Sequence, residues 1–219
     1  MSLAKFVVLT YATDELLQDS QLLDQIIREG FQEELNVRLT DGVIRGSGAG
    51  QMLGILTSPC LISVARATPG TILSSDIFNM WARLLPGSHK NSYWVCNPDS
   101  LPTLYQLTVT VGTTGGQPVF LPGGTIQGVP YSTLLGRPLI VSEVGSSLAT
   151  AGALILADFS SYAIVTKGTK VDTSLHIAYL SDQTVFRGVT RIQGQPLLNA
   201  PVVPFKGANS LSAFISLAA

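Results

Sequence analysis

The chain has 219 residues, 46% of them apolar and 12% charged, with a formal net charge of −1, so it holds one large domain or two small ones. Charge this sparse predicts that other subunits cover much of the surface, although tightly packed β-rich monomers are also poor in charge. The near-neutral balance excludes a general attraction to nucleic acid, and no apolar run reaches the roughly eighteen residues of a membrane span.

The first elements predicted are a strand and a long helix. Residues 5–10 favour a strand, and residues 1–3 resemble an expression start added to a truncated chain. Thr13 or Asp14 can cap a short helical turn, and Ser20 can cap a helix over about residues 20–44. An apolar side chain recurs at every fourth position of this helix, so the apolar stripe winds around it: Leu23, Ile27, Phe31, Leu35, Leu39 and Val43. At about 36 Å, the helix suits a spine laid across a sheet.

The rest of the chain mixes short helices and strands. Glycines at 46, 48 and 50 end the long helix, and residues 112–138 are rich in Gly and Pro, which predicts loops. Helices are predicted at residues 76–85 and 101–107. Strands are predicted at residues 93–96, 139–142, 154–157, 162–166, 173–180, 185–192 and 201–205. No regular βαβ rhythm is present, so the predicted class is α+β.

Motifs for catalysis, metal binding and nucleotide binding are missing from the sequence. Residues 46–51 lack the GxGxxG spacing and follow a helix, so a helix C-cap is the better interpretation. His89 and His176 have no metal-ligand spacing; we expect His89 to be exposed and His176 to lie on a strand face with Asp172. No GxSxG elbow is present, and nothing indicates a pair of catalytic carboxylates. We therefore predict no catalytic residue, no cofactor and no metal ligand, and expect that the chain is not an enzyme.

Charge is distributed unevenly along the sequence. Residues 14–41 hold eight acids against Arg28 and Arg38, whereas beyond Asp182 the charged residues are all basic: Arg187, Arg191 and Lys206. The two segments could complement each other between copies of the chain, or each could be a solvated face without a partner. Cys60 and Cys96 have no partner pattern, which predicts small buried side chains.

Five motifs in this order resemble the major capsid proteins of tailed bacteriophages with the Hong Kong phage type of capsid fold. The resemblance covers about residues 5–206. Its motifs are residues 13–19 with the long helix and the glycines at 46, 48 and 54; residues 94–99, which end in Asn-Pro-Asp; residues 135–141, with Gly-Arg-Pro; residues 156–162; and residues 186–191 followed by 201–203.

The resemblance implies two domains and a structural role. Residues 1–46 and 166–219 would form a peripheral domain, with the spine helix over a sheet of long strands. Residues 47–165, including the loop-rich 112–138, would form a mixed α/β axial domain. The protein would be a prophage-encoded capsid subunit that self-assembles into hexameric and pentameric capsomers around double-stranded DNA.

The same resemblance implies partners and a location. The partners would be other copies of the chain, a portal, a scaffold, a maturation protease and, without specificity, packaged DNA; no membrane is involved. The protein would lie in the virion capsid, and in the host cytoplasm during assembly.

Two departures from the family pattern matter. The family's N-terminal arm and extended loop are missing before the spine helix, so we expect that this chain alone does not build a proper shell. Some members join subunits by a Lys–Asn bond with the help of a buried Glu, but residues 185–195 hold no Asn and no acid, so cross-linking is not expected. Two alternatives remain, an encapsulin-like nanocompartment shell protein and an unrelated α+β enzyme.

Overall fold

The computed structural model describes residues 3–19, 22–111, 115–122 and 132–219. They form two compact units: unit 1 is Met1–Gly54 with Ala163–Gln195, and unit 2 is Ile55–Tyr162 with Pro196–Ala219. The predicted division placed residues 196–219 with the spine helix, whereas the structure places them in unit 2. The reason is a strand near the C-terminus, unforeseen from the sequence, which pairs inside the sheet of unit 2.

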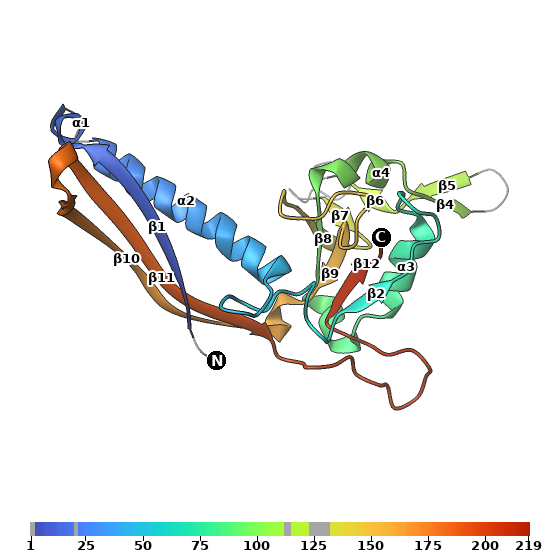
Figure 1. Ribbon diagram of the computed structural model, residues 1–219. Helices are drawn as coiled ribbons and strands as arrows, with labels where there is room; N and C mark the ends of the chain where they lie inside the picture. Colours follow the sequence, from blue (N-terminus) through green and yellow to red (C-terminus); the bar gives the residue numbers. More distant parts are fainter. Residues whose placement is uncertain (1–2, 20–21, 112–114, 123–131) are drawn as a thin grey trace. The chain divides into compact units, whose positions relative to one another are not determined.

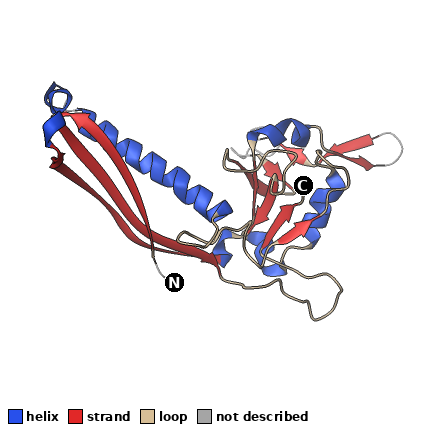
Figure 2. Cartoon of the chain, viewed as in Figure 1, coloured by secondary structure: helices blue, strands red, loops and turns tan. Residues whose placement is uncertain are grey.

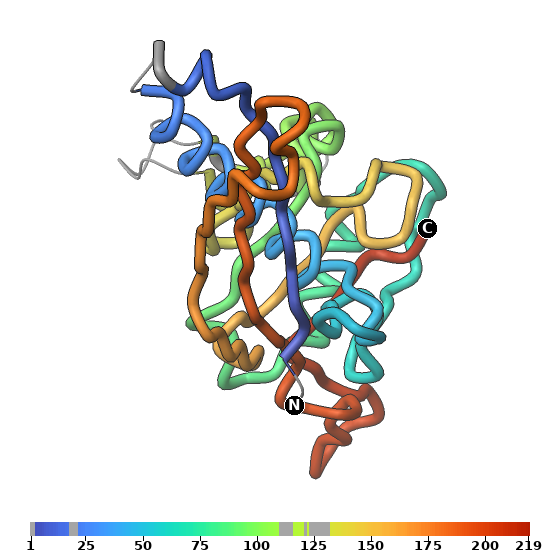
Figure 3. The backbone as a smooth tube through the Cα atoms, turned by 60° about the vertical axis from the view of Figure 1, so that its left-hand side comes forward, coloured from blue at the N-terminus to red at the C-terminus, as the bar shows by residue number. Residues whose placement is uncertain are grey.

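Unit 1 is a three-stranded antiparallel sheet with a long helix across one face (Figures 1 and 2). The strand order is β1 (Ala4–Thr13), β11 (Gln183–Pro196), β10 (Tyr162–Ala178). Figure 3 shows β1 and β11 running side by side although they come from opposite ends of the chain. Helices α1 (Asp14–Asp19) and α2 (Leu22–Arg45) follow β1. The spine helix over a sheet is therefore confirmed.

The alternation of buried and exposed residues along the strands shows which face of this sheet α2 covers. In β11 the even-numbered residues from Thr184 to Ile192 are buried, and in β1 the odd-numbered residues from Lys5 to Tyr11 are exposed. From α2, Phe31 and Leu35 are buried on this face, and Phe31 lies against Gly188, where an added Cβ would be 3.4 Å from the ring. The four-residue apolar row thus includes the residues that α2 packs on the sheet.

The end of α2 is held by a close backbone crossing between two glycines. The Gly46 N–H donates to the Gly42 carbonyl at 3.0 Å, and the Gly54 N–H donates to the Gly46 carbonyl at 2.7 Å. A Cβ at Gly46 would collide with the Met52 carbonyl, and one at Gly54 would collide with the Gly46 backbone. The helix-capping interpretation of this glycine segment is confirmed.

Unit 2 is built on a seven-stranded mixed sheet and a separate two-stranded one. The order of the large sheet is β2 (Ile62–Val64), β12 (Phe214–Leu217), β9 (Leu154–Ala157), β3 (Tyr93–Cys96), β8 (Arg137–Val141), β7 (Thr133–Leu134), β6 (Phe120–Leu121). The small sheet pairs β4 (Thr108–Val111) with β5 (Gly115–Pro118). Helices α3 (Ser74–Ala82) and α4 (Leu101–Tyr105) complete the unit. The α+β class is confirmed.

Three secondary-structure predictions were wrong. The strands predicted at residues 162–166 and 173–180 are one continuous strand, β10, because pairing with β11 overrides the weak strand propensity of the residues between them. No strand forms over residues 201–205, where Val202 makes an isolated bridge to Leu211. The described parts of the predicted loop region 112–138 contain β5, β6, β7 and the start of β8; residues 112–114 and 123–131 lie outside the described residues.

The core of unit 2 is centred on Trp94, which is fully buried. Its indole Nε1–H donates to the Leu134 carbonyl at 2.9 Å, which satisfies the one polar atom of the side chain. Cys60 and Cys96 are free thiols and both are buried, as the sequence predicted. Burial raises the pKa of the Cys96 thiol to about 11.

Candidate assembly surfaces

Unit 1 carries two faces of opposite charge, and the first is the outer side of α2. Between residues 14 and 45, acids outnumber bases by eight to three. Asp24 and Glu34 form exposed ion pairs within the helix, with Arg28 at 2.8 Å and Arg38 at 2.9 Å. The hydrogen bond from Arg28 to Asp24 raises the pKa of the guanidinium. Such exposed pairs contribute only a few tenths of a kcal/mol to stability. The helical segment remains predominantly acidic because its acids outnumber its bases.

The outer side of α2 also carries a stripe of mixed character. Ile26, Glu29, Glu33 and Val37 follow the i, i+3, i+7, i+11 spacing that places them on one side of a helix. All four are exposed, and Ile26 and Val37 are 61% and 45% accessible. We call these four residues the α2 stripe. It presents two carboxylates between two apolar side chains.

The second charged face lies on the side of the sheet away from α2. Five basic side chains line a hollow of about 400 Å³ there, with Asp172 as the acid among the lining residues. We call them the basic strip: Lys5, Lys167, Lys170, Arg187 and Arg191. Asp172 is paired with Arg187 at 3.3 Å. Lys5 and Arg191 are direct cross-strand partners, an arrangement of like charges that opposes folding.

The same face carries apolar side chains toward the β10–β11 turn. Leu9, Ile177 and Val185 line a second hollow of about 280 Å³ together with polar and charged residues, namely Asp172, Thr173, Ser174 and Arg187. The pairing of β1 with β11 sets Tyr11 beside Val185, two residue pairs nearer the turn than Leu9 and Arg187. Toward the turn, the exposed face of the sheet therefore adds exposed apolar side chains, Leu9, Tyr11 and Ile177, to its charged ones.

Large apolar side chains also project from the turn itself. Leu180 is fully exposed, Tyr179 is 80% accessible and Ile177 is 73% accessible. Helix α1 lies beside this turn (Figure 1), because the Asp14 N–H donates to the Asp182 carbonyl at 3.1 Å. Its Leu16 is 52% accessible. We call these residues the tip cluster: Leu16, Ile177, Tyr179 and Leu180.

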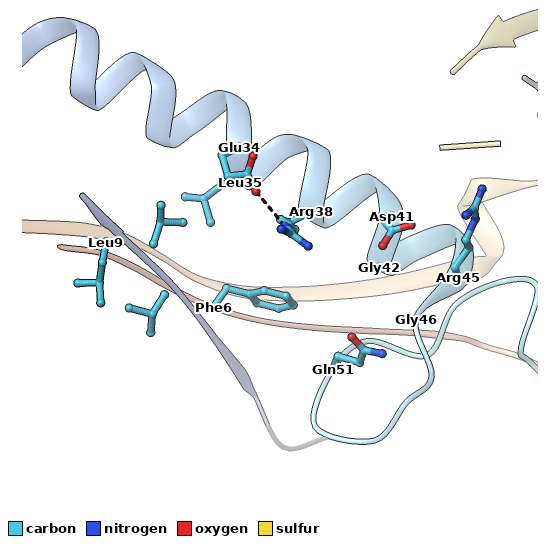
Figure 4. Close-up of a pocket in the computed structure, with 12 residues that line it drawn as sticks. Phe6, Leu9, Glu34, Leu35, Arg38, Asp41, Gly42, Arg45, Gly46 and Gln51 are labelled. Carbon is cyan, nitrogen blue, oxygen red and sulfur yellow. Dashed lines mark hydrogen bonds and ion pairs between the residues drawn. The ribbon is translucent and has the colours of Figure 1, made fainter. Parts of the chain in front are cut away.

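A groove of about 480 Å³ separates β1 from α2 (Figure 4). Phe6 points into it from the strand, and Leu35 contributes from the helix. Glu34 and Arg38 pair across its rim at 2.9 Å. Because β1 is an edge strand, the groove is open along the strand.

The two most exposed large apolar side chains in the described part of unit 2 lie on one loop. Val202 and Leu211 pair through both backbone hydrogen bonds, at 2.7 and 2.8 Å, and close the loop between them. Val203 is 81% accessible and Phe205 is fully exposed on it.

The structure also bears on the residues examined for chemistry. His176 is exposed, and Asp172 pairs with Arg187. The prediction that His89 is exposed was wrong, because its ring is half-buried and lies edge-on to Trp81 at 4.6 Å. Across the described ranges, no three His, Cys, Asp or Glu side chains gather closely enough to hold a metal ion. Of the helices in the described residues, none is both long and apolar enough to cross a membrane.

Sequence reasoning missed the surfaces that the fold assembles from distant segments. Lys5 belongs to β1 and Lys167 and Lys170 to β10, so only the strand pairing brings them beside Arg187 and Arg191. Of the tip cluster, Ile177, Tyr179 and Leu180 were predicted to end an ordinary strand, and Leu16 was predicted to lie in a short helical turn. Their signal was a pair of large apolar residues, Tyr179 and Leu180, directly before a turn.

A model of the phage capsid family matches residues 1–207. The capsid of a native GTA particle has a TM-score of 0.76 and 18% identity, over 99% of this chain and 73% of that chain. Microbacterium phage Oxtober96 gives a TM-score of 0.68 and 12% identity, over 99% of this chain and 72% of that one. The holo-SrpI encapsulin complex from Synechococcus elongatus PCC 7942 has a TM-score of 0.64 and 12% identity, over 99% of this chain and 73% of that chain. No curated protein sequence matches significantly.

Proposed function

Because the chain belongs to the phage capsid family and is a structural subunit of a phage-like shell, we propose that its copies form hexameric and pentameric capsomers around double-stranded DNA. Unit 1 would be the peripheral domain and unit 2 the axial domain. The role is structural and not enzymatic. The protein would be prophage-encoded, and it would lie in the virion capsid after assembly in the host cytoplasm.

The observation that carries this proposal is the tip cluster. Tyr179 and Leu180 project into solvent at the end of a long hairpin, where the fold offers them no cover. A large apolar side chain that becomes buried contributes about 1.5–3 kcal/mol, so several per copy provide a strong drive for association. Exposed apolar groups gathered at one end are typical of a protein–protein contact. Contacts with other copies would cover them in a shell.

The remaining partners follow from the same proposal. A portal would occupy one vertex, a scaffold would guide assembly, and a maturation protease would process the head. Packaged DNA would be contacted without sequence specificity. Of these, contact between copies has the most direct support, because the exposed apolar surface lies on the chain itself.

Electron microscopy of cells that express the protein with its neighbouring head genes tests the proposal. We expect closed shells for the wild type and none for Leu180→Asp, because the tip would carry a charge into the contact between copies. Leu180→Met is the matched control and should assemble. Leu180 is fully exposed, so circular dichroism should show that Leu180→Asp is folded. Normal shells from Leu180→Asp, or no shells from the wild type, would contradict the proposal.

A second candidate is a nanocompartment shell, favoured by the similarity to the encapsulin complex. Both candidates form closed particles, but they enclose different contents. Purified particles treated with nuclease should retain protected double-stranded DNA if the protein is a phage capsid subunit. Particles that contain a protein cargo and no protected DNA would support the nanocompartment.

A further inference from the structure

We propose that the basic strip of one copy binds the α2 stripe of a second copy. This inference rests on the proposed shell function and adds which surfaces meet. Both surfaces belong to unit 1, one on the sheet and one on the helix that covers the opposite face. Every copy therefore brings both halves of the contact. A contact between two different surfaces is heterologous, and it closes into a ring when the rotation between copies allows it.

The basic strip lacks enough acids of its own. Among the residues that line the hollow, Asp172 is the one acid and it is paired with Arg187. Within the described part of the chain, no ion pair engages Lys5, Lys167, Lys170 or Arg191. Lys5 and Arg191 repel each other as direct cross-strand neighbours. A carboxylate of a partner placed near both cations would offset this repulsion.

The α2 stripe supplies the matching charges and the matching apolar groups. Glu29 and Glu33 lie one helical turn apart, between Ile26 and Val37. On the outer face of the sheet, the Val7–Val189 pair is the next one along the strands from the Lys5–Arg191 pair, so cationic and apolar groups alternate there too. Docking would bury apolar groups against apolar groups while carboxylates meet ammonium and guanidinium groups.

Nucleic acid fits the strip less well than a second copy does. A phosphate backbone would use the cations but would leave Val7 and Val189 against a charged, hydrated strand. Aromatic side chains, on which single-stranded bases stack, are not among the lining residues of the hollow. The apolar rungs therefore favour a protein partner.

Charge-reversal variants test the contact by mutual rescue. The first variant, Lys170→Glu with Arg191→Glu, makes the strip acidic; the second, Glu29→Lys with Glu33→Lys, makes the stripe basic. By sedimentation velocity at low salt, we expect the wild type to associate and each variant alone to associate at least about tenfold more weakly, which corresponds to roughly 1.4 kcal/mol. An equimolar mixture of the two variants should recover association, because each then offers the surface that the other lost. Added salt should weaken both the wild type and the mixture.

Matched reversals outside the contact serve as the control. Lys90→Glu and Glu143→Lys change the same charges on exposed residues of unit 2 and should leave association unchanged. A mixture that associates no better than its components would overturn the inference, as would a wild type that stays monomeric at low salt. So would loss of duplex DNA binding in the strip variant alone, with self-association intact. Closed shells from both variants would overturn the inference while leaving the proposed function standing.

Discussion

The two units of this chain differ in how far they bury their apolar side chains. Unit 2 gathers them into one large buried cluster around Trp94. Under α2 in unit 1, the corresponding cluster has Ala12, Phe31 and Phe186 as its buried members, and Val8, Leu17, Leu23, Ile27 and Val171 are only partly covered. Meanwhile Val7, Leu9, Tyr11 and Ile177 remain exposed on the outer face of the sheet.

The difference follows from the number of layers in each unit. A three-stranded sheet with one helix covers one face of the sheet, so apolar side chains on its other face have no partner within the unit. In unit 2, α3 packs against β2 and β12 of the larger sheet, and side chains from α3 and α4 join those of the strands in the buried cluster. We conclude that unit 2 carries its own stability, whereas unit 1 relies on contacts with other molecules for part of its stability.

The largest expected effect comes from Trp94→Ala in unit 2. Removal of this fully buried ring should lower the free energy of unfolding by about 4 kcal/mol, because it leaves a cavity in a closed core. The Leu134 carbonyl would also lose its indole donor. Urea denaturation followed by circular dichroism measures the loss. Phe205→Ala, at a fully exposed site, is the control and should change little; equal losses in both variants would contradict a self-sufficient core in unit 2.

Phe31→Ala should have a smaller effect, confined to unit 1. We expect a loss of about 2–3 kcal/mol, below the usual range for a buried phenylalanine, since the partly covered neighbours can move into the space. Hydrogen exchange should show faster exchange in β1 and β11 with that of β3 and β9 unchanged. Val37→Ala, at an exposed site of the same helix, should leave both units unchanged. Faster exchange throughout unit 2 would show that the two units unfold together.

The fold of unit 1 was largely predictable because its signals are local. The four-residue apolar row, the capping residues and the terminal glycines each lie within one stretch of sequence, and together they define α2 within two residues at each end. In unit 2 the short strand β3 was also predicted at its observed bounds. Strand β12 was missed because Phe214–Leu217 has no turn signal of its own and is specified by its neighbours β2 and β9.

The assembly surfaces were less predictable because they depend on pairing between distant segments. Sequence reasoning recognised the acidic early segment and the basic late segment as possible complements. It did not foresee that Lys167 and Lys170 would join Arg191, because β10 was predicted as two strands with a break at those lysines. The resemblance to a family therefore indicated self-association. The residues proposed to make the contact could be identified only from the register of the strands in the sheet.

The alkaline pH dependence of stability should report on unit 2. Burial holds the Cys96 thiol neutral by raising its pKa to about 11 from an ordinary value of 9.0. The folded state thus binds this proton more tightly than the unfolded state. The contribution of the protonated thiol to the free energy of unfolding is therefore complete below about pH 9 and is lost as the pH rises toward 11. We expect unfolding to become easier by about 1 kcal/mol at about pH 10. Cys96→Ala should remove most of the slope between pH 9 and 10, because Tyr162, whose pKa burial raises from 10.0 to about 12, contributes mainly above pH 10. An unchanged slope between pH 9 and 10 would show that other groups cause it.

The smallest effect expected is a gain in stability, from Arg191→Gln in unit 1. Gln removes the repulsion with Lys5 while keeping a long polar side chain, so stability should rise by about 0.3–0.5 kcal/mol. Hydrogen exchange in β1 and β11 at low and high salt measures it, and the gain should shrink with salt because screening already weakens the repulsion.

Arg66→Gln in unit 2 is the opposite case. Arg66 donates to the carbonyls of Ala218, Thr71 and Thr150 at 2.6, 3.1 and 3.2 Å, so its loss should destabilise. One arginine is thus expected to serve the fold and the other to weaken it. If Arg191→Gln instead lowered stability, Arg191 would stabilise the fold of unit 1 itself. A partner would then no longer be needed to explain the charge of the basic strip.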